Sequence, residues 1–218
     1  MRVIAIDGPA GAGKSTVARR VAEGTGLPFL DTGAMYRCVA LAAIERGVEP
    51  GDGAAIADIA RTITVRVADG RTELDGRDVS AEIRSAPVNG IVSIIATNSD
   101  VRSVLRRAQR AWAEELGGGV VEGRDIGTVV FPDALLKVFL TASPHVRARR
   151  RVAEGGGDVE EVARSIAERD LIDSTRQDSP LRPAEGASVV DSSDRSIDQV
   201  VDEIIGLYER ARGGNRNG

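Results

Sequence analysis

IDGPAGAGKST, at residues 6–16, fits the phosphate-binding pattern G-x-x-x-x-G-K-[ST] in full from Gly8 to Ser15. The apolar run 3–6 precedes the pattern, is rich in β-branched residues and predicts a buried strand. The amphipathic segment 15–23 follows the glycines and predicts a helix. A phosphate-binding loop requires this setting, with a strand before it and a helix after it.

The loop offers backbone donors and positive charge to the phosphates of a nucleotide. Gly8, Gly11 and Gly13 can adopt backbone angles closed to other residues, so successive N–H groups can point into one concavity. The amino terminus of the following helix adds partial positive charge. We expect Lys14 to reach the β- and γ-phosphates of ATP, and the Ser15 hydroxyl to bind Mg²⁺. The expected ATP-binding residues are Gly8, Pro9, Ala10, Gly11, Ala12, Gly13, Lys14, Ser15 and Thr16.

The lysine of the loop is informative because lysine is scarce in this chain. Of the 29 basic residues, only Lys14 and Lys137 are lysines. A compact ammonium suits the loop and a broad guanidinium fork does not, which favours a functional loop over a glycine turn that binds nothing. The loop alone does not separate a kinase from a GTPase or a mechanical ATPase. The sequence has no N-K-x-D guanine segment and no acidic hhhhD-E strand end, so a small-molecule kinase fits best.

The bulk composition is that of an ordinary globular chain. Its 218 residues, 42% hydrophobic and 28% charged, suit one domain or one domain with insertions. No apolar run approaches the ~18 residues of a membrane span, and the amino-terminal stretch is too short for a signal peptide. The net charge of −4 predicts no general attraction to nucleic acid. The single cysteine, Cys38, excludes an internal disulfide framework and indicates a reducing, cytoplasmic location.

Strand and helix signals alternate along the chain, which predicts an α/β fold with a parallel sheet flanked by helices. Residues 52–85 differ, because period-two alternation and the turns Asp69-Gly70 and Asp75-Gly76 predict a small antiparallel sheet. The expected core strands are 3–6, 28–30, 120–121, 138–140 and 189–191, and those of the insert are 63–67 and 72–74. The expected helices are 15–23, 32–46, 54–61, 88–116 (interrupted near 98–100 and ended by the glycines 117–119), 145–154, 158–171 and 197–212.

Six stretches together resemble the bacterial cytidylate kinases, within the nucleoside monophosphate kinases. They are IDGPAGAGKST (6–16), LDTGAMYR (30–37), VSAEIRS (79–85), EGRDIGTVVFPDA (122–134), ERDLIDSTR (168–176) and VVDSS (189–193). They follow the family order across nearly the whole chain, and EGRDIGTVVFPDA is the most specific. The resemblance implies a phosphate-loop nucleoside monophosphate kinase fold. Its core spans about 1–33, 103–143 and 177–218, its NMP-binding insertion, which contains the small antiparallel sheet, about 34–102, and its helical lid about 144–176.

The resemblance also implies which residues surround the acceptor nucleotide. Discrimination of cytosine from uracil needs an acceptor for the exocyclic amine, and Asp125 is the expected one. Without the surrounding motif, Arg124-Asp125 would read as a weak surface ion pair at a strand end. Glu122 is expected to support Mg²⁺ through water, and Asp173 to contact the ribose or orient Arg176. The implied substrate-binding residues are Thr32, Arg37, Ser93, Arg102, Arg124, Asp125, Arg169, Asp173 and Arg176.

Arginines crowd the two helices expected around the glycines 155–157. Four of them lie within the five residues 147–151. They read as solvated helices or a nucleic-acid patch, but such density favours a nearby anion. The resemblance makes the hairpin a lid that closes over the triphosphate and excludes water. The expected catalytic residues are Lys14, Arg124, Arg150, Arg169 and Arg176.

The resulting expectation is Mg²⁺-dependent transfer of a phosphoryl group from ATP to CMP or dCMP. Its partners are then small nucleotides, with no nucleic acid and no membrane, and a monomer is the family expectation. Two alternatives remain open. One is a kinase for another small acceptor, such as UMP or shikimate, and the other is a nucleotide-binding regulator without turnover.

Overall fold

The computed structural model of the protein describes residues 1–68 and 70–214. The chain divides into two compact units. The first unit comprises Met1–Phe29 and Ala113–Gly218, and the second comprises Leu30–Trp112. Asp69 of the expected Asp69-Gly70 turn lies outside the described residues.

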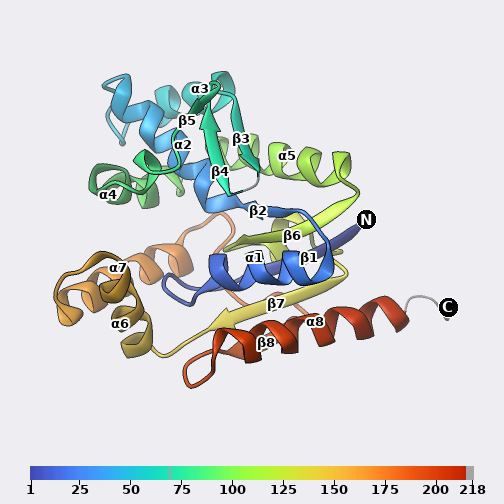
Figure 1. Cartoon of the computed structure of the whole chain (residues 1–218). Coiled ribbons are helices and arrows are strands. Elements are labelled where there is room, and N and C mark those ends of the chain that lie inside the picture. Colours follow the sequence, from blue (N-terminus) through green and yellow to red (C-terminus); the bar gives the residue numbers. More distant parts are fainter. Residues whose placement is uncertain (69, 215–218) are drawn as a thin grey trace. The chain divides into compact units, whose positions relative to one another are not determined.

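A five-stranded sheet forms the centre of the first unit, with the strand order β2-β6-β1-β7-β8. Its strands are β1 (Arg2–Asp7), β2 (Phe29–Asp31, which begins at the last residue of the segment Met1–Phe29), β6 (Gly118–Gly123), β7 (Leu136–Thr141) and β8 (Ser188–Asp191). β1 lies between β6 and β7 and is parallel to both, with Ile4 opposite Val120 and Leu136 (Figure 1). β7 is also parallel to β8. The predicted parallel core sheet is confirmed.

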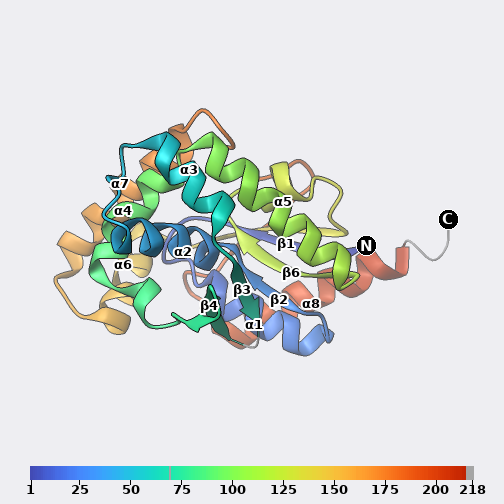
Figure 2. The same ribbon diagram turned by 90° about the horizontal axis from the view of Figure 1, so that it is seen from above.

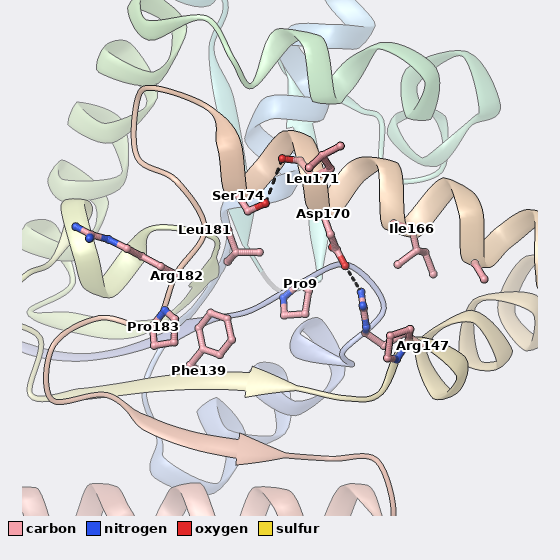
Figure 3. Close-up of a pocket in the computed structure, with 13 residues that line it drawn as sticks. Pro9, Phe139, Arg147, Ile166, Asp170, Leu171, Ser174, Leu181, Arg182 and Pro183 are labelled. Carbon is pink, nitrogen blue, oxygen red and sulfur yellow. Dashed lines mark hydrogen bonds and ion pairs between the residues drawn. The ribbon is translucent and has the colours of Figure 1, made fainter.

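Two helices of the first unit, α6 (Pro144–Gly155) and α7 (Val159–Thr175), pack side by side (Figures 1 and 2). Ser143 and Asp158 cap their amino termini through side-chain oxygens. α7 runs a turn beyond the predicted end at Leu171, because the N–H of Arg176 still donates to the carbonyl of Ile172 at 3.1 Å. A pocket of about 510 Å³ lies along α7 (Figure 3). Its lining includes Pro9, Phe139, Ile166, Leu181 and Pro183.

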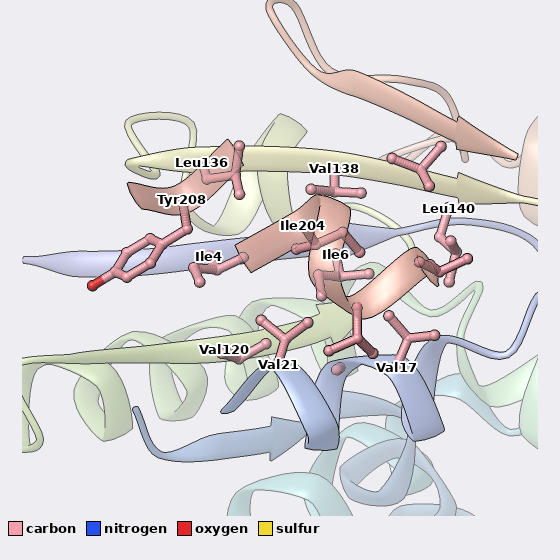
Figure 4. Packing of buried hydrophobic residues seen from close by; sticks show 14 of the residues in the cluster. Ile4, Ile6, Val17, Val21, Val120, Leu136, Val138, Leu140, Ile204 and Tyr208 are labelled. Carbon is pink, nitrogen blue, oxygen red and sulfur yellow. The ribbon is translucent and has the colours of Figure 1, made fainter. Parts of the chain in front are cut away.

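The hydrophobic core of the first unit joins the sheet to α1 (Lys14–Thr25) and α8 (Ile197–Gly214). Alternate strand residues such as Ile4 and Ile6 meet Val17 and Val21 of α1 and Ile204 of α8 (Figure 4). All of these side chains are buried. Because β1 is central in the sheet, this packing anchors both ends of the loop between β1 and α1.

The second unit holds helices and a small antiparallel sheet of order β3-β4-β5. The predicted antiparallel sheet is thereby confirmed. β3 begins two residues later than the predicted strand 63–67, because the N–H of Thr64 donates to the Asp75 carboxylate (2.7 Å) instead of to a strand. The predicted break in the long helix is also confirmed, since the Asn98 side chain caps a new helix through the N–H groups of Asp100 and Val101. The elements are α2 (Thr32–Glu45), α3 (Gly53–Thr62), β3 (Val65–Ala68), β4 (Arg71–Leu74), β5 (Arg77–Asp78), η1 (Glu82–Arg84), α4 (Ala86–Ile95) and α5 (Ser99–Glu115, of which the residues up to Trp112 belong to this unit).

One glycine cluster differs from its predicted role. Gly117, with φ of 72°, ends a helix as predicted, but Gly118 and Gly119 belong to β6. Gly118 has a φ of 136°, and a Cβ there would lie 2.2 Å from the carbonyl oxygen of Arg2. Close approach to β1 therefore explains this glycine. In the described part of the chain, no helix combines the length and apolar character needed to cross a bilayer.

Candidate active site

The phosphate loop joins β1, the central strand, to α1. Gly8 has a φ of 155°, and a Cβ there would lie 2.0 Å from the carbonyl oxygen of Leu140 in β7. Gly13 caps α1 in the left-handed conformation, with φ of 85°. Because Gly13 has no side chain, it cannot cap the first-turn N–H groups of α1, which can therefore face an anion. Thr16 lies exposed on that first turn.

Lys14 lies buried under the loop, among other cations of the first unit. Its Nζ donates to the carbonyl of Pro9 at 2.8 Å. Burial and the nearby Arg124 and Arg169 guanidinium groups lower the pKa of Lys14 well below its usual range, although Glu122 opposes the shift. Three cations held this close repel one another, so a bound polyanion would stabilise the arrangement. The sequence analysis expects Lys14, Arg124 and Arg169 to be catalytic, and the structure places the two guanidinium groups near the Lys14 ammonium.

The Ser15 hydroxyl donates a hydrogen bond to Glu122, which is 4% exposed on β6. Because the hydroxyl proton points to the carboxylate, the lone pairs of Ser15 Oγ remain available to a hard cation. A second hard oxygen ligand, directly or through water, is available on Glu122. These two residues therefore fit Mg²⁺ bound with a nucleotide, as the sequence predicts for Ser15. Within the described ranges, no group of three or more His, Cys, Asp or Glu side chains forms a metal cage.

Asp7 is a site residue that the sequence analysis did not identify. It ends β1 directly before Gly8, and its carboxylate accepts the N–H groups of Ile126 (2.8 Å) and Gly127 (2.7 Å). Burial raises the pKa of Asp7 to about 6, while the two hydrogen bonds oppose the rise. These residues open η2 (Ile126–Val130), a π-helical turn that follows Asp125. The only sequence signal was a lone carboxylate at the end of a buried strand.

A buried ion-pair network joins the loop after β6 to the end of α7. Arg124 Nε donates to Asp173 Oδ2 at 2.8 Å, and Arg176 Nη1 lies 3.5 Å from Asp173 Oδ1. Arg176 Nη2 lies 3.9 Å from Asp125 Oδ1. Burial raises the pKa of Asp173, but Arg124 and Arg176 outweigh it and hold that pKa below its usual value. The reading of Arg124-Asp125 as an exposed surface pair is wrong, because Asp125 is 5% exposed and Arg124 binds Asp173.

Two arginines of α6 contact the phosphate loop or its neighbours. Arg150 donates to the Ser192 hydroxyl (2.9 Å) and carbonyl (2.6 Å), and Ser192 Oγ lies within donating distance of the carbonyls of Thr141 (3.0 Å) and Ala12 (3.3 Å). Arg147 donates to the carbonyl of Ala10 at 3.0 Å. Both arginines are therefore held by hydrogen bonds to other segments of the first unit. Arg149 is exposed.

The remaining expected acceptor-binding residues belong to the second unit. Thr32 opens α2, and Ser93 is half-buried on α4. Arg37 of α2 donates to the Ile83 carbonyl (3.0 Å) and to Asn89 Oδ1 (2.6 Å). Arg102 is 1% exposed, donates to the Ala96 carbonyl (3.1 Å) and lies with its guanidinium 5.7 Å from the ring centre of Tyr36. Contacts within the second unit thus fix the side chains of both Arg37 and Arg102.

The parallel sheet, the phosphate loop after its central strand and the arginine-bearing helical pair define a phosphate-loop kinase of the nucleoside monophosphate kinase fold. The family model described as Cytidylate kinase matches residues 4–210, and the chain belongs to the cytidylate kinase family. The resemblance found in the sequence is thereby confirmed.

Individual relatives agree with this assignment. A cytidylate kinase from Desulforamulus reducens is 48% identical over 97% of this chain and 98% of its own length. One from Pelotomaculum thermopropionicum is 49% identical over 96% of each chain. A solved gluconokinase from Sinorhizobium meliloti is 18% identical, with a TM-score of 0.52 over 100% of this chain and 97% of its own, and shares the fold.

Proposed function

We propose that the protein transfers the γ-phosphoryl group of ATP to CMP and dCMP, giving CDP or dCDP and ADP. The observation that carries the proposal is the cluster of Lys14, Arg124 and Arg169 beside the phosphate loop, in a chain of the cytidylate kinase family. Membership of the family gives the acceptor class, and the cation cluster provides the charge that phosphoryl transfer requires.

On the donor side, residues 8–16 bind the triphosphate through backbone N–H groups and Lys14. Mg²⁺, held by Ser15 with support from Glu122, neutralises phosphate charge when bound with ATP. An oxygen of the acceptor phosphate attacks the γ-phosphorus, and the bond to the β–γ bridging oxygen breaks, so that ADP leaves with the electron pair. No general base is needed, because the attacking oxygen is already anionic.

For the acceptor nucleotide, we propose the residues that the family resemblance implies. They are Thr32, Arg37, Ser93, Arg102, Arg124, Asp125, Arg169, Asp173 and Arg176. Asp125 accepts from the exocyclic amine of cytosine, and the arginines hold the phosphate through bidentate forks. The buried network of Arg124, Asp173 and Arg176 supports this role, because it holds these groups in fixed orientation.

Residues 144–176 form the lid and residues 34–102 the acceptor-binding insertion. Lid arginines Arg150, Arg169 and Arg176 stabilise the charge that develops on the transferred group. The lid tip contains Gly156 and Gly157, both with positive φ, where the chain can flex between α6 and α7. Closure would exclude water, which otherwise competes with the acceptor for the phosphoryl group.

We also propose that the protein works as a monomer in the cytoplasm on free nucleotides. The formal charge of −4 supports the choice of free nucleotides, because it gives no general attraction to nucleic acid.

A coupled ADP assay tests the function directly. Purified protein is given ATP and Mg²⁺ with CMP, dCMP, UMP, AMP or shikimate, one acceptor at a time. We expect CMP and dCMP to be phosphorylated with the highest kcat/KM. A preference for UMP or shikimate would overturn the acceptor assignment. If no ADP forms with any of the five acceptors, the result would instead favour a nucleotide-binding regulator.

A further inference from the structure

Arg147 and Asp170 together bind both backbone groups of a single phosphate-loop residue, Ala10. We propose that these two side chains are a positioning pair, which holds the first half of the loop in its ATP-binding shape from the base of the lid. The inference rests on the proposed function only in taking ATP as the ligand of the loop. Neither residue was among the sites expected from the sequence.

The hydrogen bonds form a closed cycle around Ala10. Arg147 Nη1 donates to the Ala10 carbonyl at 3.0 Å and also to the Asp170 carboxylate. The other Asp170 oxygen accepts the N–H of Ala10 at 3.3 Å. Arg147 Nε donates in addition to the carbonyl of Ala142 at 3.1 Å, which fixes the guanidinium plane. One ion pair thus fixes the peptide groups on both sides of Ala10.

Packing supports the same contact. Gly11 has a φ of 75°, and a Cβ there would lie 3.1 Å from both the Cβ and the carbonyl oxygen of Arg147. The backbone of the loop therefore lies directly on the first turn of α6. Arg147 is 7% exposed, and an ion pair shielded from water in this way interacts more strongly than a surface pair.

The pair stands at the edge of the pocket along α7 (Figure 3). Figure 3 shows the Asp170 and Arg147 side chains pointing toward each other, with Pro9 nearby. Most of the other lining side chains, such as Phe139 and Ile166, are apolar. Asp170 and Arg147 thus connect α7, α6 and the loop at one point.

This arrangement predicts that the arginines of the lid have different functions. Arg147 is held by the protein and is not available to follow the transferred phosphate. Its function is to keep the Ala10 peptide groups in place, so that less order has to be imposed on the loop when ATP binds. Loss of the pair should therefore weaken binding of ATP and ADP without a matching loss for the acceptor.

Calorimetric titration with ADP, in the absence of any acceptor, tests the proposal independently of turnover. We expect Arg147→Gln and Asp170→Asn each to raise the Kd for ADP about tenfold, the size expected for losing a charge-assisted hydrogen bond. In steady-state assays, KM for ATP should rise in parallel while KM for CMP stays within about twofold. Arg149→Gln, which removes an exposed arginine from the same helix, is the matched control and should change neither constant.

The double variant separates positioning from general damage. Because the two side chains act as one unit, Arg147→Gln combined with Asp170→Asn should weaken ADP binding no more than either change alone. Unchanged ADP affinity in folded single variants would overturn the proposal. So would equal losses for ADP and CMP, or fully additive effects in the double variant. If the wild-type chain failed to phosphorylate CMP, the ADP titration would still decide this inference.

Discussion

The two units hold their polar residues in place in different ways. In the first unit, the contacts that shape the site join segments far apart in the chain, such as Asp7 with Ile126, 119 residues later, and Ala10 with Arg147, 137 residues later. In the second unit, Arg102 contacts Ala96 only six residues away, and Arg37 contacts Ile83 across 46. The donor site therefore depends on the whole first unit being folded, whereas much of the second unit's site is set by neighbouring helices.

The largest expected effect tests the donor side of this comparison. Lys14→Ala should lower kcat about 10³-fold, because a cation aimed at the developing phosphate charge is lost. Steady-state assays with saturating CMP measure the change. Lys137→Ala is the matched control, since Lys137 Nζ donates to the carbonyl of Glu185 at 3.3 Å, and the variant should retain nearly full activity. Similar losses in both variants would contradict the special position of Lys14.

The second prediction asks whether burial of the charged Asp7 side chain in the first unit lowers the free energy of unfolding. Its folded pKa of about 6 lies above the usual aspartate value of 3.8, so the folded state binds the proton more tightly. The contribution of Asp7 to the free energy of unfolding should therefore fall as pH rises from about 4 to about 6, by up to about 3 kcal/mol. Urea unfolding of wild type and Asp7→Asn across this range should show a stability difference that changes with pH.

The subtraction of the two curves removes the titration of other carboxylates. A stability difference that stays constant between pH 4 and pH 7 would show that burial of Asp7 does not cost stability as the structure implies. Asp52→Asn in the second unit is the control for introducing an amide. Asp52 is an amino-terminal cap of α3, and Asn caps about as well as Asp.

Asp125 tests the acceptor side. Asp125→Asn should lower the preference for CMP over UMP by about 10- to 100-fold, because the carboxylate acceptor for the cytosine amine is replaced by an amide. KM for ATP should change little. The ratio of kcat/KM for CMP and UMP, measured beside KM for ATP, gives the answer. A fall in ATP affinity with CMP affinity unchanged would show that the assigned role is wrong.

The smallest effect is that of Tyr208→Phe, in the hydrophobic core of the first unit. Tyr208 is 1% exposed, and its hydroxyl has no hydrogen-bond partner among residues 1–68 and 70–214. Tyr208→Phe should raise the free energy of unfolding by up to about 1 kcal/mol, because a buried unsatisfied hydroxyl is removed. Tyr208→Ala should lower it by about 3 kcal/mol or more, since the ring fills the core. Thermal unfolding of both variants checks the pair, and a clear loss in Tyr208→Phe would reveal a hydroxyl contact.

Much of the fold followed from local pattern. The strand before Gly8, the break near Asn98 and the small antiparallel sheet were all predicted, because hydrophobic periodicity and capping chemistry act over a few residues. The two wrong assignments also concern short stretches of the chain. Gly118 was assigned to a helix end, because nothing nearby in the sequence shows that β1 approaches it within van der Waals distance. η2 was missed because a π-helical turn has no periodic signature.

The sequence alone determined the phosphate loop, the family and the residue types of the site. A loop that binds phosphate through its own backbone consists of consecutive residues, so its pattern can be recognised without the tertiary structure. Only the tertiary structure decided that Ser15 donates a hydrogen bond to Glu122 and that Asp7 accepts hydrogen bonds from the first residues of η2. The same holds for the contact of Arg147 and Asp170 with Ala10. The residues in these contacts lie far apart in the chain: Ser15 and Glu122 by 107 positions, Asp7 and Ile126 by 119, and Ala10 and Arg147 by 137. Parallel strands need long connections, so no local pattern reports which residues meet at the ends of β1 and its neighbours.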